Sequence, residues 1–268
     1  MKEWLYIGIG IVMVSGTVLG LVLHQAYALV DFIRKVEDDT NCEACEQKTI
    51  CLAQKPIGRS NWVTEFMYIT YLKVGRKCLP NNQQRIGYWL IPALINGSMD
   101  ILLYLQYGWS ADFVLCALCT AVLLYLSIVD WKTQYIPLEC NLFIFILGLI
   151  RLILQPGRWL GQVIGLCSVS VVLLLVDWIG SKLLNRDHVV GDGDIKLMAA
   201  AGLFLGWKLN IVAFMMGCIG GSIIHLIIMK IGKGERQLAF GPYLAMGIYI
   251  AMICGEQLMS WYLGIMGL

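Results

Sequence analysis

The chain has 268 residues, of which 59% are hydrophobic and 14% are charged, and its formal net charge is +2. This composition is too apolar for a soluble domain of this length, and the small net charge gives no indication of nucleic-acid binding. Apolar runs of roughly 17–25 residues cross a bilayer as helices, and several such runs occur. The composition therefore predicts an all-α polytopic membrane protein.

Eight apolar runs predict about eight transmembrane helices, with one polar segment at residues 31–87 between the first and the second. The first run is too long for the core of a signal peptide and lacks a small-residue cleavage site, so we interpret it as a helix. We expect three parts: a first helix within 1–30, the polar segment 31–87, and a membrane domain over 88–268. The expected helices cover residues 4–30, 88–107, 111–129, 142–154, 159–184, 197–205, 210–231 and 238–261.

The lysine and arginine residues predict the orientation, because these residues favour the cytoplasmic side of a membrane. Nine of the twenty lie in the polar segment. With eight helices, seven more fall on the same side and three fall on the other, while Arg151 lies within a helix. This 16-to-3 distribution predicts a cytoplasmic polar segment and termini on the opposite side. It also places Asp130 and Asp194 at the same cytoplasmic face.

Two aspartates stand out as candidate catalytic residues. Asp194 ends the stretch Gly191-Asp192-Gly193-Asp194, which we expect to form a link before a short apolar helix. Asp130 ends another apolar run. Carboxylates at membrane segments are costly and mark functional sites by default. The glycines give the backbone access to positive φ and to close contact with another chain. The alternative interpretation is an acidic loop without chemistry.

Two converging carboxylates can carry out aspartic-protease chemistry. Like charges at short range do not both ionise easily, so the pair shares one proton. The ionised member can then take a proton from water, while the protonated member polarises a peptide carbonyl. Asp192 can raise the pKa of Asp194 as a neighbouring charge. Lys196 has either a catalytic role or the ordinary role of a cation at a helix end.

Four cysteines gather in the polar segment: Cys42, Cys45, Cys51 and Cys78. The spacing Cys42-x-x-Cys45 is typical of metal ligands, and distant thiolates can complete a tetrahedral zinc site. A reducing cytoplasm favours a metal over a disulfide. We therefore predict a structural zinc site with these four ligands; the alternative is a degenerate site that binds no metal.

Three motifs together resemble those of the type IV prepilin peptidases. Gly191-Asp192-Gly193-Asp194 resembles the family's Gly-x-Gly-Asp motif. Asp130, followed six residues later by Ile136-Pro137, resembles the first catalytic motif. Phe240-Gly241-Pro242-Tyr243 resembles the motif of the last helix. The motifs stand in the family's order and on consistent helices, and the resemblance is clearest from Asp130 onward.

The resemblance implies an eight-helix membrane aspartic endopeptidase of the bacterial inner membrane. Its substrates would be prepilins and pseudopilins, which lose a short basic leader at the cytoplasmic face. The implied catalytic pair is Asp130 and Asp194. The implied motif and substrate-positioning residues are Pro137, Gly191, Gly193 and Lys196.

A second activity is also implied by the resemblance. In the family, the polar segment is associated with N-methylation of the new N-terminus by S-adenosylmethionine. Bacterial members often carry two Cys-x-x-Cys pairs there. This chain departs from that pattern at Asn81, where the partner of Cys78 would stand, and Cys51 can supply the missing thiolate.

Other functions remain open from the residues alone. A small transporter would use acids spread through the membrane, with Asp100, Asp177 and His225 as its key residues. For Asp100 and Asp177 the ordinary alternative is buried hydrogen bonding within the bundle. A non-catalytic scaffold of a pilus or secretion apparatus is a third possibility, which the presence of both motif aspartates disfavours. An archaeal-type preflagellin peptidase would lack the long cysteine-bearing segment.

Overall fold

The computed structural model describes residues 8, 10–18, 86–184, 189–230 and 239–266. The four cysteines predicted to bind zinc and most of the first expected helix lie outside these residues. The chain divides into two compact units, Met1–Ser98 and Met99–Leu268. Within the first unit, Asn96 Nδ2 donates a hydrogen bond to the carbonyl oxygen of Gly16 at 3.0 Å.

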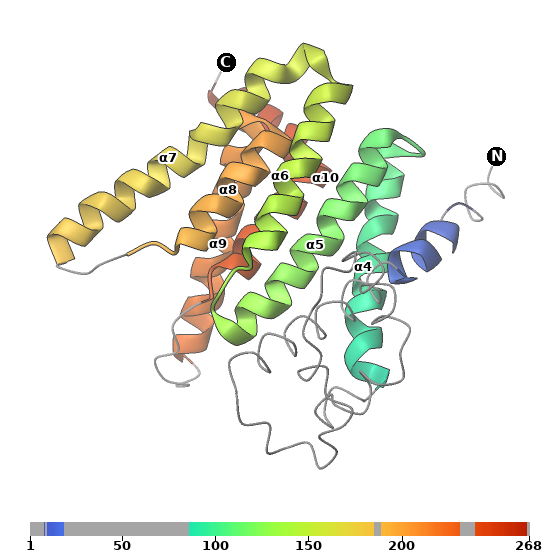
Figure 1. The fold of residues 1–268 in the computed structure, drawn as a ribbon, viewed down its shortest axis with the longest axis horizontal. Coiled ribbons are helices and arrows are strands. Elements are labelled where there is room, and N and C mark those ends of the chain that lie inside the picture. Colours follow the sequence, from blue (N-terminus) through green and yellow to red (C-terminus); the bar gives the residue numbers. More distant parts are fainter. Residues whose placement is uncertain (1–7, 9, 19–85, 185–188, 231–238, 267–268) are drawn as a thin grey trace, which may run out of the picture. The chain divides into compact units, whose positions relative to one another are not determined.

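The described residues form helices joined by short turns, and no strand occurs among them, which confirms the all-α prediction (Figure 1). The second unit holds the end of α4 and all the following elements. From residue 86 onward, the described residues form seven α-helices and one 3-10 turn: α4 (Ile86–Tyr107), α5 (Ala111–Thr133), α6 (Leu138–Leu154), η2 (Pro156–Arg158), α7 (Trp159–Leu184), α8 (Asp192–Leu205), α9 (Trp207–Lys230) and α10 (Gly241–Met266).

Four of the described segments are long and apolar enough to cross a membrane: Ala111–Trp131, Pro156–Leu183, Trp207–Ile227 and Gly241–Ile265. This supports a helical membrane protein. Helices α6 and α8 have only 17 and 14 residues, and a bilayer core requires about 20 residues from an untilted helix. The number of about eight spans therefore stays a prediction.

Helix α8 forms the centre of the second unit. It contacts α6, α7, α9 and α10, and Figure 1 shows it between α6 and α7. Most of its residues after Asp194 are buried, including Leu197, Met198 and Phe204. A helix that is apolar all round is typical of a fully enclosed position. The short apolar run expected here is therefore the core around which the longer helices pack.

Glycines bring α7 and α8 into close contact. A Cβ atom on Gly165 would collide with the carbonyl oxygen of Gly202, and a Cβ atom on Gly202 would collide with that of Gly165. Small residues let helix backbones approach closely where lipid provides no hydrophobic driving force. Asn210 of α9 joins the same contact, because its Nδ2 donates to the carbonyl oxygens of Gly165 and Met198 at 3.2 Å each. Three helices are thus held together at this point.

Two helix starts differ from the sequence prediction. Helix α8 begins at Asp192, not at residue 197, because the Gly191 carbonyl accepts the N–H groups of Asp194 and Ile195 at 3.0 and 3.3 Å. Helix α10 begins at Gly241, not at residue 238. Pro242 is therefore its second residue, where a missing N–H group leaves no carbonyl of the helix without a partner.

The connection after α5 is also shorter than expected. Helix α5 continues to Thr133 instead of ending at residue 129, and it stops at Gln134, which takes a left-handed conformation with φ of 55°. Helix α6 starts at Leu138 instead of residue 142, directly after Pro137 as its N-cap. Proline has no N–H group to donate to a preceding helical turn, so a helix begins at or just after it, and Pro137 therefore sets the start of α6.

Replacing Gly165 by alanine is expected to lower the stability of the folded protein. The new methyl group would meet the α8 backbone, which cannot move aside as a side chain can, and such overpacking costs about 1–3 kcal/mol. Thermal unfolding in detergent measures the effect. Gly157→Ala is the matched control, because a Cβ atom there meets nothing within 4 Å. Equal unfolding temperatures for the two variants would contradict this packing.

Candidate functional site

Asp130 lies in the last turn of α5 and is 4% exposed. Its Oδ2 atom accepts the backbone N–H of Gly241 at 2.9 Å. Gly241 is the first residue of α10, whose N–H has no acceptor within that helix. The start of a helix carries a partial positive charge, so this bond stabilises the ionised carboxylate. A Cβ atom on Gly241 would lie only 2.6 Å from Oδ2, which explains the glycine in this motif.

Asp194 lies in the first turn of α8, rather than in the link before it. Its Oδ1 atom is buried and has no hydrogen-bond partner. Burial first, and the charge of Asp130 second, raise the pKa of this carboxyl group from 3.8 to about 7. The two predicted catalytic aspartates therefore interact electrostatically. Asp130 lies in the last turn of α5 and contacts the start of α10, and Asp194 lies in the first turn of α8.

Ile136 packs between the two glycine motifs. A Cβ atom on Gly193 would lie 2.8 Å from the Ile136 Cβ, and one on Gly241 would lie 3.1 Å from its Cδ1. Ile136 is 7% exposed, and Pro137 follows it as the N-cap of α6. The segment after Asp130 therefore packs, through Ile136, on the starts of both α8 and α10.

The motif glycines serve close contact rather than unusual backbone angles. We expected Gly191 and Gly193 to give access to positive φ, and this was wrong. Gly191 has φ of −65°, and among the described glycines only Gly108 and Gly206 have positive φ. A Cβ atom on Gly191 would lie 3.0 Å from Asp194 Oδ2. The absent side chains leave room for Asp194 and Ile136.

Two further residues position the motif: Asn141, which the sequence analysis did not single out, and Asp177, for which it left two roles open. Asn141 of α6 is buried, and its Nδ2 donates to the Gly193 carbonyl at 3.3 Å. Asp177 of α7 accepts the N–H groups of Val189 and Val190 at 2.7 and 2.9 Å, directly before the motif. Asp177 thus has the buried hydrogen-bonding role that we set against a catalytic one. The sequence feature that could have identified Asn141 is a polar side chain one turn after Pro137, at the start of an apolar run.

Asp192 and Lys196 lie on the exposed side of α8. Their side chains are 69% and 56% exposed, and they form an ion pair of 3.8 Å one turn apart. Burial and Asp130 account for the raised pKa of Asp194, and Asp192 is not a cause. The hypothesis that Asp192 raises this pKa is therefore wrong. The exposed position of Lys196 favours its ordinary role over a catalytic one.

Metal ligands do not gather in the part of the chain that the structure describes. No three His, Cys, Asp or Glu side chains there are placed to hold a metal ion. The predicted zinc ligands Cys42, Cys45, Cys51 and Cys78 fall outside this part. The chemistry that the described site supports is acid–base catalysis by two carboxylates that compete for one proton.

Comparisons with known proteins give a consistent result. The model of the type IV leader peptidase family matches residues 117–226, a range that includes Asp130 and Asp194. A Neisseria gonorrhoeae protein is 32% identical over 205 residues, which is 73% of this chain and 68% of that protein. A Pseudomonas aeruginosa protein is 29% identical over 211 residues, covering 74% and 69%. Both are named prepilin leader peptidase/N-methyltransferase.

Proteins of the same name from Aeromonas are matched over less of their length. The Aeromonas salmonicida protein is 33% identical over 177 residues, which is 65% of this chain and 59% of that protein. The chain therefore spans about three fifths of the Aeromonas relatives that it matches. No solved structure matches the chain. On the strength of the Neisseria relative and the family model, this chain belongs to the type IV leader peptidase family.

Proposed function

We propose that the protein is a membrane aspartic endopeptidase whose catalytic residues are Asp130 and Asp194. The observation that carries the proposal is the electrostatic coupling of these two carboxylates at the starts of α8 and α10. Both lie in the region matched by the family model. The relatives named prepilin leader peptidase/N-methyltransferase supply the substrate class, prepilins, and the motif resemblance extends this class to pseudopilins.

The mechanism follows from the different surroundings of the two carboxylates. Asp130, whose carboxylate accepts the Gly241 N–H, takes a proton from water while the water oxygen bonds to the peptide carbonyl carbon. Protonated Asp194 gives its proton to the carbonyl oxygen. When the tetrahedral intermediate collapses, the C–N bond breaks, the proton on Asp130 passes to the leaving nitrogen, and Asp194 regains a proton from a hydroxyl group. The pair returns to its starting state.

The site would act at the membrane surface. Asp130 ends a membrane-spanning segment, and the distribution of basic residues predicts that this end faces the cytoplasm. We therefore place the protein in the bacterial inner membrane, with about eight spans and the three parts expected from sequence. A prepilin would present its basic leader to the cytoplasm and its apolar stem to the membrane, with the cleaved bond between them.

Replacing either aspartate of the pair by asparagine is expected to abolish cleavage of a prepilin by the purified protein. An amide can neither take a proton from water nor share a proton with the other carboxyl group. Loss of acid–base catalysis lowers the rate roughly 100- to 10,000-fold. Mass spectrometry of the product measures cleavage for Asp130→Asn and Asp194→Asn. Exposed Asp192→Asn is the control and is expected to cleave normally. Normal cleavage by either catalytic variant would contradict the proposal, and no cleavage by the wild type would favour a non-catalytic scaffold.

Activity is expected to fall as the pH rises through about 7. The folded protein raises the pKa of Asp194 above its ordinary value of 3.8, so the proton needed for catalysis is present below that pH and lost above it. The same sign applies to stability: the contribution of this group is complete below pH 4 and lost as the pH rises through 7. The pH dependence of kcat/KM measures the effect. A rate that stays constant up to pH 9 would exclude protonated Asp194 as the acid.

Asp177→Ala is expected to lower kcat more than it raises KM. Without the two hydrogen bonds to Val189 and Val190, the segment before Asp194 loses its anchor on α7, and each bond contributes about 0.5–1.5 kcal/mol. Hydrogen exchange at these two amides should accelerate in parallel, about tenfold or more. Asp192→Ala is the matched control and leaves both amides protected. Unchanged exchange in Asp177→Ala would refute the anchoring role.

The polar segment would supply structure and the second activity. We infer that Cys42, Cys45, Cys51 and Cys78 bind one zinc ion, because a set of thiolate donors with a Cys-x-x-Cys pair fits zinc. Four thiolates leave no open position, so the ion would be structural. The names of the relatives extend the proposal to N-methylation. The motif resemblance implies that the target is the new N-terminus and that S-adenosylmethionine would supply the methyl group.

Metal analysis of the purified protein tests the zinc proposal without an activity assay. We expect one zinc ion for each wild-type chain and a clear loss in Cys45→Ser. Cys167→Ser is the matched control, because Cys167 is an exposed thiol of α7. Wild-type protein purified without chelators that holds no zinc would contradict the proposed ligand set. Cleavage with and without S-adenosylmethionine, read by mass spectrometry, reports the added methyl group separately.

A further inference from the structure

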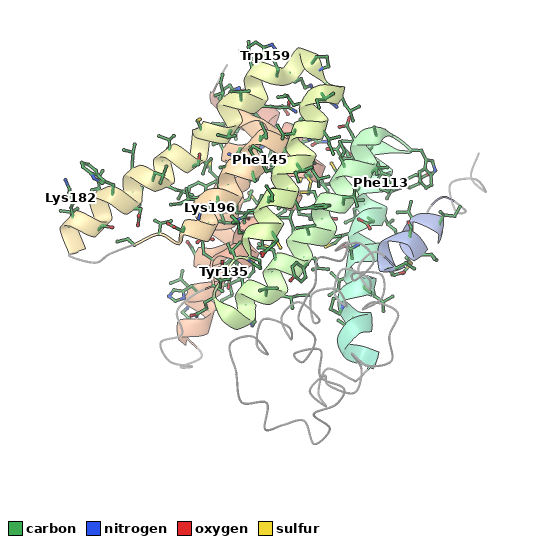
Figure 2. All side chains as sticks on the ribbon, viewed as in Figure 1. Phe113, Tyr135, Phe145, Trp159, Lys182 and Lys196 are labelled. Atoms are coloured by element: carbon green, nitrogen blue, oxygen red, sulfur yellow. The ribbon has the colours of Figure 1, made fainter. Side chains whose placement is uncertain are left out.

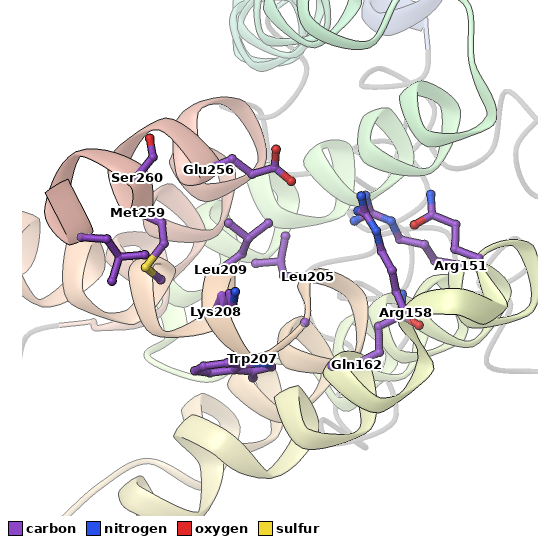
Figure 3. A pocket seen from close by; sticks show the side chains of 14 residues that line it. Arg151, Arg158, Gln162, Leu205, Trp207, Lys208, Leu209, Glu256, Met259 and Ser260 are labelled. Atoms are coloured by element: carbon purple, nitrogen blue, oxygen red, sulfur yellow. The ribbon is translucent and has the colours of Figure 1, made fainter. Parts of the chain in front are cut away.

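A cavity lies at the end of α8 that is opposite to Asp194. It has a volume of ≈ 480 Å³ and is bounded by α7, the start of α9 and the last part of α10. Leu205 lines the cavity and follows Asp194 by 11 residues on α8, which places the two about 17 Å apart along the helix. Figure 3 shows Arg151 and Arg158 on one side of this cavity, and Glu256, Met259 and Ser260 on the other. The cavity is therefore distinct from the two aspartates.

Cationic groups make the cavity suitable for a phosphate. Arg158 and Lys208 line it, and neither has an ion pair within the described residues. The third cation, Arg151, already has partners within the protein. Its Nε donates to Asp112 Oδ1 at 3.1 Å, and its Nη1 donates to the Phe204 carbonyl oxygen at 3.1 Å. Helix α9 begins at Trp207 on the same wall, and the N–H groups of a first turn have no acceptor within the helix. A helix start with nearby cations favours a phosphate group.

Two acceptors make the cavity suitable for a hydrogen-bond donor as well. Gln162 of α7 is 4% exposed, lines the cavity, and has a buried Oε1 atom without a hydrogen-bond partner. A buried acceptor without a partner is unfavourable, because it has lost its hydrogen bonds to water. The Glu256 carboxylate lies on the opposite wall. A ligand that joins a phosphate to an ammonium or hydroxyl group could bind the cations with its phosphate and donate hydrogen bonds to the two acceptors.

The remaining walls and the position favour a lipid. Leu209, Met259 and Leu263 supply an apolar lining. The cavity lies where two membrane-spanning segments, Pro156–Leu183 and Trp207–Ile227, begin. Trp159 and Trp207 are 52% and 39% exposed at this end, and Figure 2 shows Trp159 at the far end from Tyr135. Exposed tryptophans beside basic residues are typical of the membrane interface.

We propose that this cavity binds the headgroup of a glycerophospholipid that carries a hydrogen-bond donor, such as phosphatidylethanolamine. The phosphate lies against Arg158, Lys208 and the start of α9. The ammonium or hydroxyl group lies against Glu256 and Gln162. The lipid would link α7, α9 and α10 at the surface opposite to the catalytic end, and its binding is independent of peptidase activity.

Lipid binding to the purified full chain in detergent, measured by native mass spectrometry, tests the proposal. We expect wild-type protein to bind phosphatidylethanolamine more tightly than phosphatidylcholine, whose headgroup has no donor. The double variant Arg158→Gln with Lys208→Gln should bind phosphatidylethanolamine about tenfold more weakly or worse, since each charge-assisted bond is strong. The matched control, Lys182→Gln with Lys230→Gln, removes two exposed charges from the other ends of α7 and α9 and should bind as the wild type does.

A second variant keeps the test valid if the double variant does not fold. Glu256→Gln preserves the shape of the side chain and should remove the preference for phosphatidylethanolamine over phosphatidylcholine. Three results would overturn the proposal: equal binding of the two lipids by the wild type, unchanged binding by the variants, or loss of the lipid in excess inorganic phosphate. The last result would identify a site for free phosphate instead.

Discussion

The structure of the site depends on the packing of Ile136 between Gly193 and Gly241. Any Cβ atom on these glycines would overlap or crowd the Ile136 side chain, so the segment after α5 fits only when both positions lack side chains. This contact brings the starts of α8 and α10 to the end of α5. The first N–H of α10 then reaches Asp130, and Asp194 in the first turn of α8 comes within electrostatic range of it. One apolar contact thus sets the geometry of two charged groups.

The two ends of α8 have different surroundings. At its start, Asp194 is buried near the charge of Asp130, and both raise its pKa. At its other end, Gly202 brings α7 close, and the chain turns through Gly206 into α9, whose first turn faces a cavity with Arg158 and Lys208. The first end favours proton transfer, and the second favours a phosphate. A short helix keeps these chemistries about 17 Å apart.

The sequence predicted the elements better than their contacts. Long apolar runs and the aspartate motifs gave the helical class, most helix positions and the candidate pair Asp130 and Asp194. Helix starts were missed where the determinant was a hydrogen bond, as at Asp192, or a proline in the second position, as at Pro242. The contact of Asn141 could not be predicted, because its partner is a backbone carbonyl 52 residues away. The role of Gly191 was wrong because a glycine required for space and one required for positive φ look the same in a sequence.

Infrared spectroscopy of the protonated carboxyl group of Asp194, as a function of pH, tests the central claim that the two aspartates titrate as a coupled pair. We predict a carboxylic-acid band that disappears with a midpoint near pH 7 in the wild type and is absent in Asp194→Asn. In Asp130→Asn the midpoint should fall, because the charge of Asp130 is removed, yet stay above 3.8, because the burial of Asp194 remains. A midpoint that is the same in the wild type and in Asp130→Asn would contradict the coupling, and with it the shared proton on which the proposed catalysis depends.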